Sequence, residues 1–385
     1  MKKTLLASTM AAAAAFAGPS FAETLKIGLA TAQTGGLAGY DGPVIEGVHI
    51  AVDEINAEGG INGSILIELV EKDVRSDAAQ TAIAVQELAD EGVSMIVLPC
   101  DADPALASIG TVTSAQIPAI STCASSPTLP MIGGDFMFAN FPGDNVQATV
   151  SAEWARGEGH ETAYIIYSPD SQYTTMPLYF SDVFEALGGE VLGQDTHSIG
   201  QQDFSAIATR IAALDPQPDV IMTSSYEPDF PSMLKALRAA GVTSQVIGSD
   251  GIDSPTTFSL GDVGEGVVFT TAGHATEGSP LAEFNAKYEA ATGSASETVF
   301  NAVGYDLVIV VAEAVKAAGS TDPVAIRDAL AELENVRGAT SLITYKGTNG
   351  MPVREVTLIR VTDGERELVG QPSPTAELIP APRMQ

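Results

Sequence analysis

Apolar segments that alternate with amphipathic helical stretches constrain the fold of this 385-residue chain more than any other feature. The alternation begins at Thr24, with strands predicted at residues 25–30 and 94–98. It restarts after Phe141, where residues 163–167 and 220–224 read as further strands. Continuous apolar strands joined by helices predict parallel sheets that helices cover on both faces. The sequence therefore predicts an α/β protein with two βα units of similar length.

A third part of the chain begins near Ala275. It contains helical stretches, followed by two short strands around Asp363-Gly364, a pair of residues typical of hairpin turns. Its predicted helices span 281–292, 297–317 and 324–333. The length of the chain suggests two domains, each with its own core. We expect the Pro-rich tail, residues 371–385, to be loosely held.

Residues 1–22 have the three parts of a secretory signal peptide. Lys2 and Lys3 form a positive region, residues 5–17 are apolar, and Ser20 and Ala22 put small residues before a cleavage site after Ala22. The apolar run is shorter than the roughly 20 residues that span a bilayer, which disfavours the alternative of a membrane anchor. We expect export to the periplasm as a soluble protein.

The formal net charge of the chain is −31 at pH 7, and the acidic residues are scattered rather than clustered. Nucleic acids and anionic membranes bind to basic patches, so this charge disfavours both as partners. Most of the acidic residues are expected to form a solvated surface.

Ligands of open parallel sheets bind beyond the carboxyl ends of the strands. The segments predicted to lie there hold polar and aromatic residues but no Lys or Arg. They are residues 33–40, 100–103, 122–126, 168–173, 225–227 and 250–253. A binding site made from these loops would recognise its solute without a cationic side chain.

Motifs typical of enzymes are missing from the sequence. It contains no phosphate-binding loop, no nucleophile elbow and no H-E-x-x-H metal motif, and the Gly-rich stretch 261–266 does not fit the dinucleotide pattern. The four histidines are scattered and none has ligand spacing to the two cysteines: His49, His160, His197 and His274. We expect no catalytic residues, metal site or cofactor.

Several segments carry a resemblance to a known family. Residues 34–40 read T-G-G-L-A-G-Y. A helix expected from about Pro43 to Ala57, with Pro43 in its first turn, leads into I-N-A-E-G-G-I-N-G at 55–63. Q-D-F-S at 202–205 and A-A-G at 239–241 add to the pattern. Together they closely resemble the type I periplasmic solute-binding proteins of branched-chain amino acid ABC importers. The resemblance extends from Leu25 to about Gly370.

This resemblance implies a Venus-flytrap fold, in which two doubly wound parallel-sheet lobes are joined by three hinge crossovers. The first lobe would comprise residues 23–141 and 275–345, and the second 142–274 and 346–370. The implied function is that of a monomeric receptor that binds an amino-acid-like solute between the lobes and presents it to the membrane subunits of an ABC permease. A receptor that feeds a sensory system is the alternative.

The resemblance also implies solute contacts, carried over residue by residue from the Leu/Ile/Val-binding proteins. They are Tyr40, Asp101, Ala124, Ser125, Tyr173, Tyr226, Asp250 and Phe300. Ser125 would hold the α-carboxylate of the solute and Asp250 its α-ammonium, as a charge-assisted pair. Tyr173 and Tyr226 would descend from the second lobe on closure, and Tyr40 and Phe300 would border the apolar part of the solute.

Each role has a plainer alternative. Ser125 is also placed to cap the next helix, and Asp250-Gly251 also reads as a simple turn. Phe300 lies in an apolar helix and suits a core position, and the two second-lobe tyrosines suit the surface.

Asp101 departs from the family pattern, which has Ser at this position. Two acids in a cleft without a nearby cation would favour a solute with a second positive group or several N–H donors. The alternatives are that Asp101 caps the helix that follows it or is paired by backbone N–H groups.

Cys100 and Cys123 end two consecutive strands that are expected to be neighbours in the sheet. Export permits disulfide formation. We therefore predict a disulfide between them, beside the proposed contacts Asp101 and Ala124.

Overall fold

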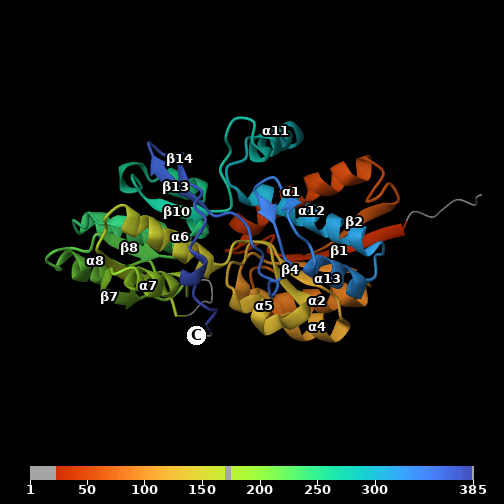
Figure 1. Ribbon diagram of the computed structural model, residues 1–385, viewed down its shortest axis with the longest axis horizontal. Helices are drawn as coiled ribbons and strands as arrows, with labels where there is room; N and C mark the ends of the chain where they lie inside the picture. Colours follow the sequence, from red (N-terminus) through yellow and green to blue (C-terminus); the bar gives the residue numbers. More distant parts are fainter. Residues whose placement is uncertain (1–22, 170–174, 384–385) are drawn as a thin grey trace, which may run out of the picture.

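The computed structural model describes residues 23–169 and 175–383. The predicted signal peptide lies outside this part of the chain. The described residues form two α/β lobes that lie side by side along the long axis of the molecule (Figure 1). Throughout those residues, every helix is too short or too polar to cross a membrane.

The first lobe is built on a five-stranded sheet in which all neighbouring strands are parallel. Its strands, in the spatial order β2-β1-β3-β4-β5, are β2 (Ile65–Asp73), β1 (Glu23–Thr31), β3 (Met95–Leu98), β4 (Ala119–Ser121) and β5 (Met137–Ala139). The helices between them are α1 (Ala38–Ala57), α2 (Ala78–Asp90), α3 (Ala102–Leu106), α4 (Ile109–Ala115) and α5 (Thr128–Gly133).

The second lobe is built on a seven-stranded sheet with the order β14-β13-β10-β9-β8-β6-β7. The strands β6 (Thr162–Tyr167), β7 (Glu190–Thr196), β8 (Val220–Thr223), β9 (Gln245–Gly248) and β10 (Val268–Thr271) are parallel to one another. The predicted hairpin forms the antiparallel edge, β13 (Thr357–Thr362) and β14 (Glu365–Gly370). The helices are α6 (Asp144–Gly157), α7 (Met176–Ala186), α8 (Ser205–Ala212), α9 (Asp229–Ala239) and the short α10 (Pro255–Phe258).

The chain passes between the lobes three times: after β5, after β10 and before β13. Between the second and third passages it adds helices to the first lobe, α11 (Pro280–Thr292), α12 (Phe300–Ala318) and α13 (Pro323–Ala331), and a small hairpin, β11 (Val336–Arg337) and β12 (Leu342–Ile343). The predicted α/β fold with two parallel-sheet lobes and three crossovers is confirmed.

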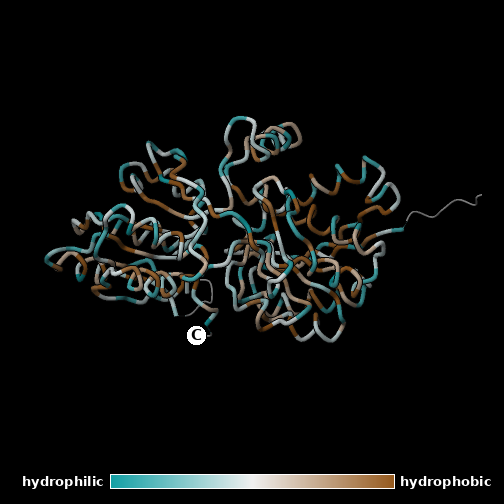
Figure 2. The backbone as a smooth tube through the Cα atoms, viewed as in Figure 1, coloured by the Kyte–Doolittle hydropathy of each residue, from teal (hydrophilic) through white to brown (hydrophobic). Residues whose placement is uncertain are grey.

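Burial on both faces explains why the strands are continuously apolar. In β3, Met95 and Val97 belong to the core beneath α1 and α12, whereas Ile96 and Leu98 belong to the core beneath α2 and α4. Figure 2 shows apolar segments running through the interior of both lobes. Full burial of such side chains stabilises the fold by about 1.5–3 kcal/mol each, which offsets the entropy lost on ordering the chain.

Helix α1 begins earlier than the sequence suggested. We expected Pro43 in the first turn of a helix starting there, but the helix starts at Ala38 and Pro43 lies inside it. The buried carboxylate of Asp41 accepts hydrogen bonds from the backbone N–H groups of Ala32, at 2.6 Å, and Cys100, at 2.8 Å. These bonds hold the first turn of α1 against the loops that follow β1 and β3. They outweigh the preference of proline for the first turn of a helix.

A buried ion pair lies at the crossovers. Arg354, just before β13, pairs with Asp306 of α12 at 3.2 Å, and both side chains are fully buried. Arg354 also donates to the backbone oxygen of Asn140, in the first crossover, while Asn140 donates to Val303 of α12 at 3.0 Å. The first and third crossovers are thus both bound to α12.

The described part of the Pro-rich tail is not loosely held. The Asn145 side chain donates to the Pro380 oxygen at 2.8 Å, and the Arg383 backbone donates to the Tyr179 hydroxyl at 3.0 Å. The tail therefore lies along α6 and α7 of the second lobe, since these partners belong to those helices. Composition alone did not indicate these partners.

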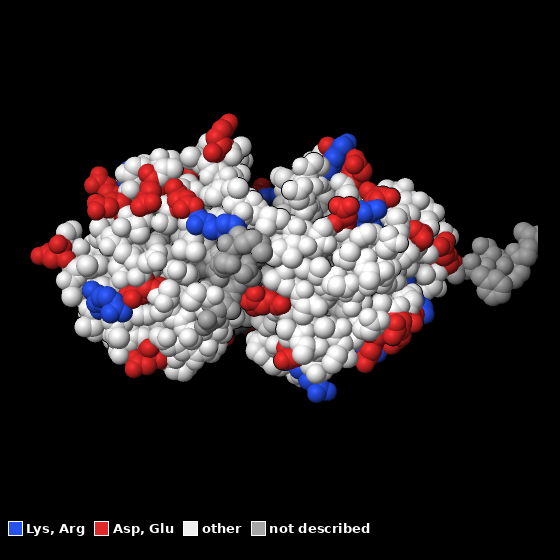
Figure 3. Space-filling view, turned by 90° about the horizontal axis from the view of Figure 1, so that it is seen from below, with Lys and Arg blue, Asp and Glu red and all other residues white. Residues whose placement is uncertain are grey.

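Acidic side chains are scattered over both lobes on the face shown in Figure 3, with few basic ones among them. This distribution fits the sequence count, in which 49 Asp and Glu stand against 18 Lys and Arg.

The predicted disulfide is present. Cys100 and Cys123 join the loops that follow β3 and β4, with their Cα atoms 4.4 Å apart. Both loops lie at the carboxyl ends of the strands, on the side of the sheet that faces the other lobe.

We predict that replacing both cysteines, Cys100→Ser with Cys123→Ser, lowers the free energy of unfolding by about 3 kcal/mol, because the bond closes a loop in the unfolded chain. Urea unfolding monitored by circular dichroism measures this change. Reduction of the unmodified protein should give a similar loss. Unchanged stability, with two free thiols titrating in the unreduced and unfolded protein, would contradict the prediction.

Candidate functional site

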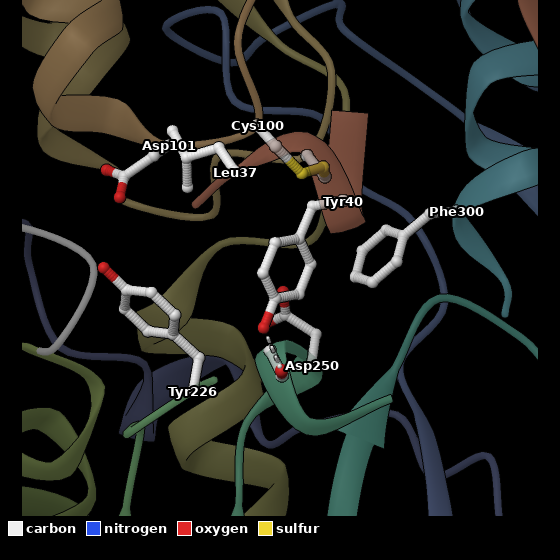
Figure 4. A pocket seen from close by; sticks show the side chains of 9 residues that line it. Leu37, Tyr40, Cys100, Asp101, Tyr226, Asp250 and Phe300 are labelled. Atoms are coloured by element: carbon white, nitrogen blue, oxygen red, sulfur yellow. Dashed lines mark hydrogen bonds between the residues drawn. A yellow bond between two sulfur atoms is a disulfide. The ribbon is translucent and has the colours of Figure 1, made fainter. Parts of the chain in front are cut away.

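A pocket lies between the lobes, at the carboxyl ends of both sheets. Its free volume is about 30 Å³, well below that of ordinary ligand sites, so the lobes as placed here leave little space between them. The residues that line it come from both lobes: Leu37, Tyr40, Cys100, Asp101, Cys123, Tyr226, Asp250, Gly251 and Phe300. Figure 4 shows them as a mainly apolar and aromatic wall with two carboxylates.

The placement of these side chains follows from the two parallel sheets. Asp101 and the disulfide follow β3 and β4, and Tyr226 follows β8. Asp250 and Gly251 lie in a short 3₁₀ turn after β9. Because strands of one direction end at the same edge, loops far apart in the sequence meet there.

Tyr40 and Phe300 are brought together by two closely packed helices, α1 and α12. A Cβ atom at Gly47 would lie 1.8 Å from the Asn301 oxygen, and one at Gly304 would lie 2.0 Å from the Val44 oxygen. Only glycine permits this approach, which leaves the Tyr40 and Phe300 rings edge to face with centroids 5.7 Å apart. Phe300 belongs to the core of the first lobe and also lines the pocket.

The Tyr40 hydroxyl connects the lobes. It donates to the Gly251 oxygen at 2.9 Å and accepts from the Glu227 backbone N–H at 3.3 Å. Burial raises its pKa, so it stays a neutral donor at physiological pH. Its ring stands edge-on to Tyr226, with centroids 6.2 Å apart. With the hydroxyl engaged in this way, the ring of Tyr40 borders the pocket.

Asp101 caps the following helix and also lines the pocket. Its Oδ1 accepts from the Asp103 backbone N–H at 3.0 Å and caps α3, and the same carboxylate lines the pocket. Burial raises its pKa to about 7, and the charge of Asp103 acts in the same direction. Capping α3 therefore does not withdraw the Asp101 carboxyl group from the pocket wall.

Asp250 is the better placed acid for binding a cation. It is 2% exposed, it lines the pocket, and its Oδ1 has no hydrogen-bond partner among the described residues. Burial raises its pKa to about 7, while the nearby Gln147 amide acts in the opposite direction. A buried carboxylate oxygen without a donor is costly unless a ligand supplies one.

Ala124 and Ser125 follow Cys123 but are not among the residues that line the pocket. The Ala124 side chain packs in the core beneath α2 and α4, and its N–H donates to the Ser121 hydroxyl at 3.3 Å. Ser125 caps no helix, since α5 starts at Thr128, and its buried hydroxyl has no hydrogen-bond partner among the described residues. Tyr173, the remaining expected contact, lies outside the described residues.

Sequence reasoning missed Asp144. This residue starts α6 at the first crossover and is fully buried. Burial raises its pKa well above the usual value, and the charges of Asp250 and then Asp101 add to the effect, while the Ser125 hydroxyl acts in the opposite direction. Asp144 is not in the loops predicted to bind a ligand, because it follows a crossover and not the end of a strand. An acidic residue after Pro142-Gly143, at the start of a helix, was the signal in the sequence that could have identified it.

A Ser–His–Asp grouping exists elsewhere in the second lobe. The His197 Nε2 lies 2.8 Å from the Ser225 hydroxyl, and its Nδ1 lies 3.6 Å from Asp229. Ser225 is only 1% exposed and its hydroxyl accepts from Thr223 at 3.0 Å. The hydroxyl is thus held inside the lobe, where a substrate does not reach it.

The carboxylates of the cleft do not form a metal site. Within residues 23–169 and 175–383, no three His, Cys, Asp or Glu side chains are grouped closely enough to hold a metal ion. The pocket therefore offers separate acidic contacts in an aromatic surround rather than a coordination sphere.

Known proteins resemble this chain over most of its length. The family model described as periplasmic binding protein matches residues 24–366. A Leu/Ile/Val-binding protein of Rhizobium johnstonii is 28% identical over 367 residues, which are 94% of this chain and 98% of that protein.

Solved structures agree with this assignment. A branched-chain amino acid transporter substrate-binding protein of Streptococcus pneumoniae, in complex with isoleucine, is 25% identical, covers 91% of this chain and 100% of its own, and has a TM-score of 0.81. A solute-binding protein of R. palustris in complex with benzoate has a TM-score of 0.80 at 18% identity, covers 91% of this chain and 97% of its own, and resembles it in fold alone. The chain therefore belongs to the periplasmic binding protein family that includes the Leu/Ile/Val-binding proteins.

Proposed function

We propose that this protein is the periplasmic receptor of an ABC importer, and that it binds an amino acid or a related amine-bearing small solute between its lobes. Export with cleavage after Ala22 and delivery of the solute to the permease subunits are parts of this proposal. The family membership supports the receptor role. The nature of the solute rests on the side chains of the cleft, because one fold serves many ligands.

The observation that carries the proposal is the Asp250 carboxylate. It is buried, lines the pocket and keeps one oxygen without a hydrogen-bond partner in the described structure. No Lys, Arg or His is among the described residues that line the pocket. An ammonium group of the solute would supply both the missing donor and the missing charge in one contact.

The aromatic wall favours the same class of solute. Tyr40, Tyr226 and Phe300 surround the space next to Asp250 (Figure 4). Ring faces attract cations and ring bodies cover the apolar parts of a small molecule. An amine on a short hydrocarbon frame would satisfy both.

Binding would also favour closure of the lobes. Asp101 and the disulfide belong to the first lobe, and Asp250 and Tyr226 to the second. A solute that contacts both sides stabilises the closed form by its differential affinity for that form. The bridge from Tyr40 to Gly251 and Glu227 would then be made.

We predict that Asp250→Asn weakens binding of the preferred solute by roughly 10- to 100-fold, because it removes one charge-assisted hydrogen bond. Isothermal titration calorimetry, after a thermal-shift screen of amino acids, amides, polyamines and carboxylates, measures this loss. Asp262→Asn, an exposed change in the same lobe, is the matched control and should leave affinity unchanged. Equal affinity of Asp250→Asn and the unmodified protein for every solute would refute the assigned contact.

A second prediction concerns pH. Asp101 and Asp250 have pKa values of about 7, above the 3.8 of an ordinary Asp, so the folded state binds more protons than the unfolded state between about pH 4 and pH 7. The stability that these groups contribute is present at low pH and is lost as pH rises through about 7. Protein prepared without solute should therefore melt a few degrees higher at pH 5 than at pH 8.

The Asp250→Asn variant should show a smaller difference between the two melting temperatures, since one of the titrating groups is gone. Differential scanning calorimetry at both pH values makes the comparison. A variant with the same pH dependence as the unmodified protein would contradict the assignment of Asp250.

The importer role is tested in the organism that makes the protein. Deletion of its gene should abolish high-affinity uptake of the radiolabelled solute identified by calorimetry, and the gene supplied in trans should restore it. Unimpaired uptake together with loss of a solute-dependent response would favour the sensory alternative.

A further inference from the structure

The proposed function uses one carboxylate and leaves Asp144 without a role. Its side chain is fully buried, and neither of its carboxylate oxygens has a hydrogen-bond partner among the described residues. Its backbone N–H is satisfied, donating to the Ser125 oxygen at 2.8 Å. A buried acid without a hydrogen-bond partner is costly to keep charged, and a positive group nearby would lower that cost.

Asp144 belongs to the same electrostatic cluster as the pocket. It lies close enough to Asp250 and Asp101 for their charges to act on it, and those two side chains line the cavity. The buried cation at the crossovers, Arg354, is already engaged by Asp306 and Asn140. Two buried acids therefore line the pocket, with Asp144 close behind them, and the described residues that line the pocket supply no positive charge.

A single ammonium does not balance this cluster. A zwitterionic amino acid is a worse match still, because it would bring a carboxylate as well. The residue expected to hold that carboxylate is Ser125, and the Ser125 hydroxyl is close enough to Asp144 to act on its titration. A solute carboxylate at that position would repel Asp144 whenever this acid is ionised, since like charges repel strongly in a medium of low polarity.

A wider cavity next to the pocket has the same sign of charge. Tyr40 also lines a wider cavity next to the pocket, and the charged residues of that cavity are all acidic: Glu46, Glu227, Asp253 and Glu297. Asp253 is paired with Arg366 at 2.5 Å. The net negative charge of the cavity wall therefore comes from the three glutamates. A cleft lined by one sign of charge raises the local concentration of ligands of the opposite sign.

An inorganic cation does not explain these features. The described acids are not grouped as a metal site, and the aromatic wall of Tyr40, Tyr226 and Phe300 suits a hydrocarbon frame. An organic molecule with positive nitrogens at its two ends fits both the separated carboxylates and the apolar surface between them.

We propose that the pocket takes a small dication with two N–H-bearing nitrogens and no carboxylate, such as an α,ω-diamine. Asp101 of the first lobe and Asp250 of the second lobe contact its two ends, and Asp144, whose ionised form a nearby positive group favours, reinforces the negative side of the site. This inference rests on the proposed receptor function and narrows its solute. Because the two ends are held by different lobes, such a solute would itself draw the lobes together.

The test is calorimetry on the mature full-length protein with three probes: 1,4-diaminobutane, n-butylamine and L-leucine. The diamine should bind at least about tenfold more tightly than the other two, since it gains at least one further charge-assisted contact. n-Butylamine is the matched probe, because it has the same hydrocarbon frame and only one nitrogen.

Two variants examine the acids. Asp144→Asn and Asp101→Ser should each weaken diamine binding by about tenfold or more and change n-butylamine binding far less. Serine retains the ability to cap α3, and asparagine keeps the shape of Asp144 without its charge. Asp262→Asn again serves as the control. If Asp101→Ser fails to fold, Asp144→Asn carries the test alone.

L-Leucine or n-butylamine binding as tightly as the diamine would overturn the inference and leave the receptor function intact. An equal loss for both amines in the variants would overturn it as well. Absence of binding by all three probes also rejects the dication, whereas the receptor function fails only if the wider panel of amino acids, amides, polyamines and carboxylates gives no ligand.

Discussion

The buried pair between Arg354 and Asp306 is the interaction on which the arrangement of the two lobes depends. It binds the third crossover to α12, and through the backbone oxygen of Asn140 it binds the first crossover to the same helix. Removing one partner of such a pair typically costs several kcal/mol, because the other charge stays buried without compensation. The first and third crossovers thus have a common attachment on the first lobe.

The cleft shows the opposite treatment of buried charge. At the crossovers an acid meets its cation within the chain, whereas Asp101 and Asp250 meet none among the described residues that line the pocket. The ion pair at the crossovers forms when the chain folds and stabilises the fold. The acids of the pocket gain a positive partner only when a solute binds. Tyr40 links the two, since its ring borders the pocket and its hydroxyl joins the lobes.

Much of this could be predicted from the sequence because it depends on local patterns. Strands such as β3 are apolar throughout because both of their faces are covered, and this pattern is visible without a structure. The convergence of strand ends, together with family resemblance, brought Asp101, Tyr226 and Asp250 into consideration. Asp144 was not predicted as a candidate site residue, because its burial depends on how α6 packs at a crossover. The first turn of α1 and the path of the Pro-rich tail were also mispredicted, because contacts with distant segments, through Asp41 and Tyr179, outweigh the local preferences.

The disulfide has a consequence for when the pocket comes into being. Cys100 immediately precedes Asp101, Cys123 lies two residues before Ser125, and both cysteines are part of the pocket wall. Thiols remain reduced in the cytosol, where a chain is synthesised, and disulfides form in oxidising compartments. One side of the cavity is therefore finished by a chemical reaction rather than by folding alone. A newly made chain with free thiols lacks the covalent tie between these two loops, and we expect it to hold its solute less firmly until it has been oxidised.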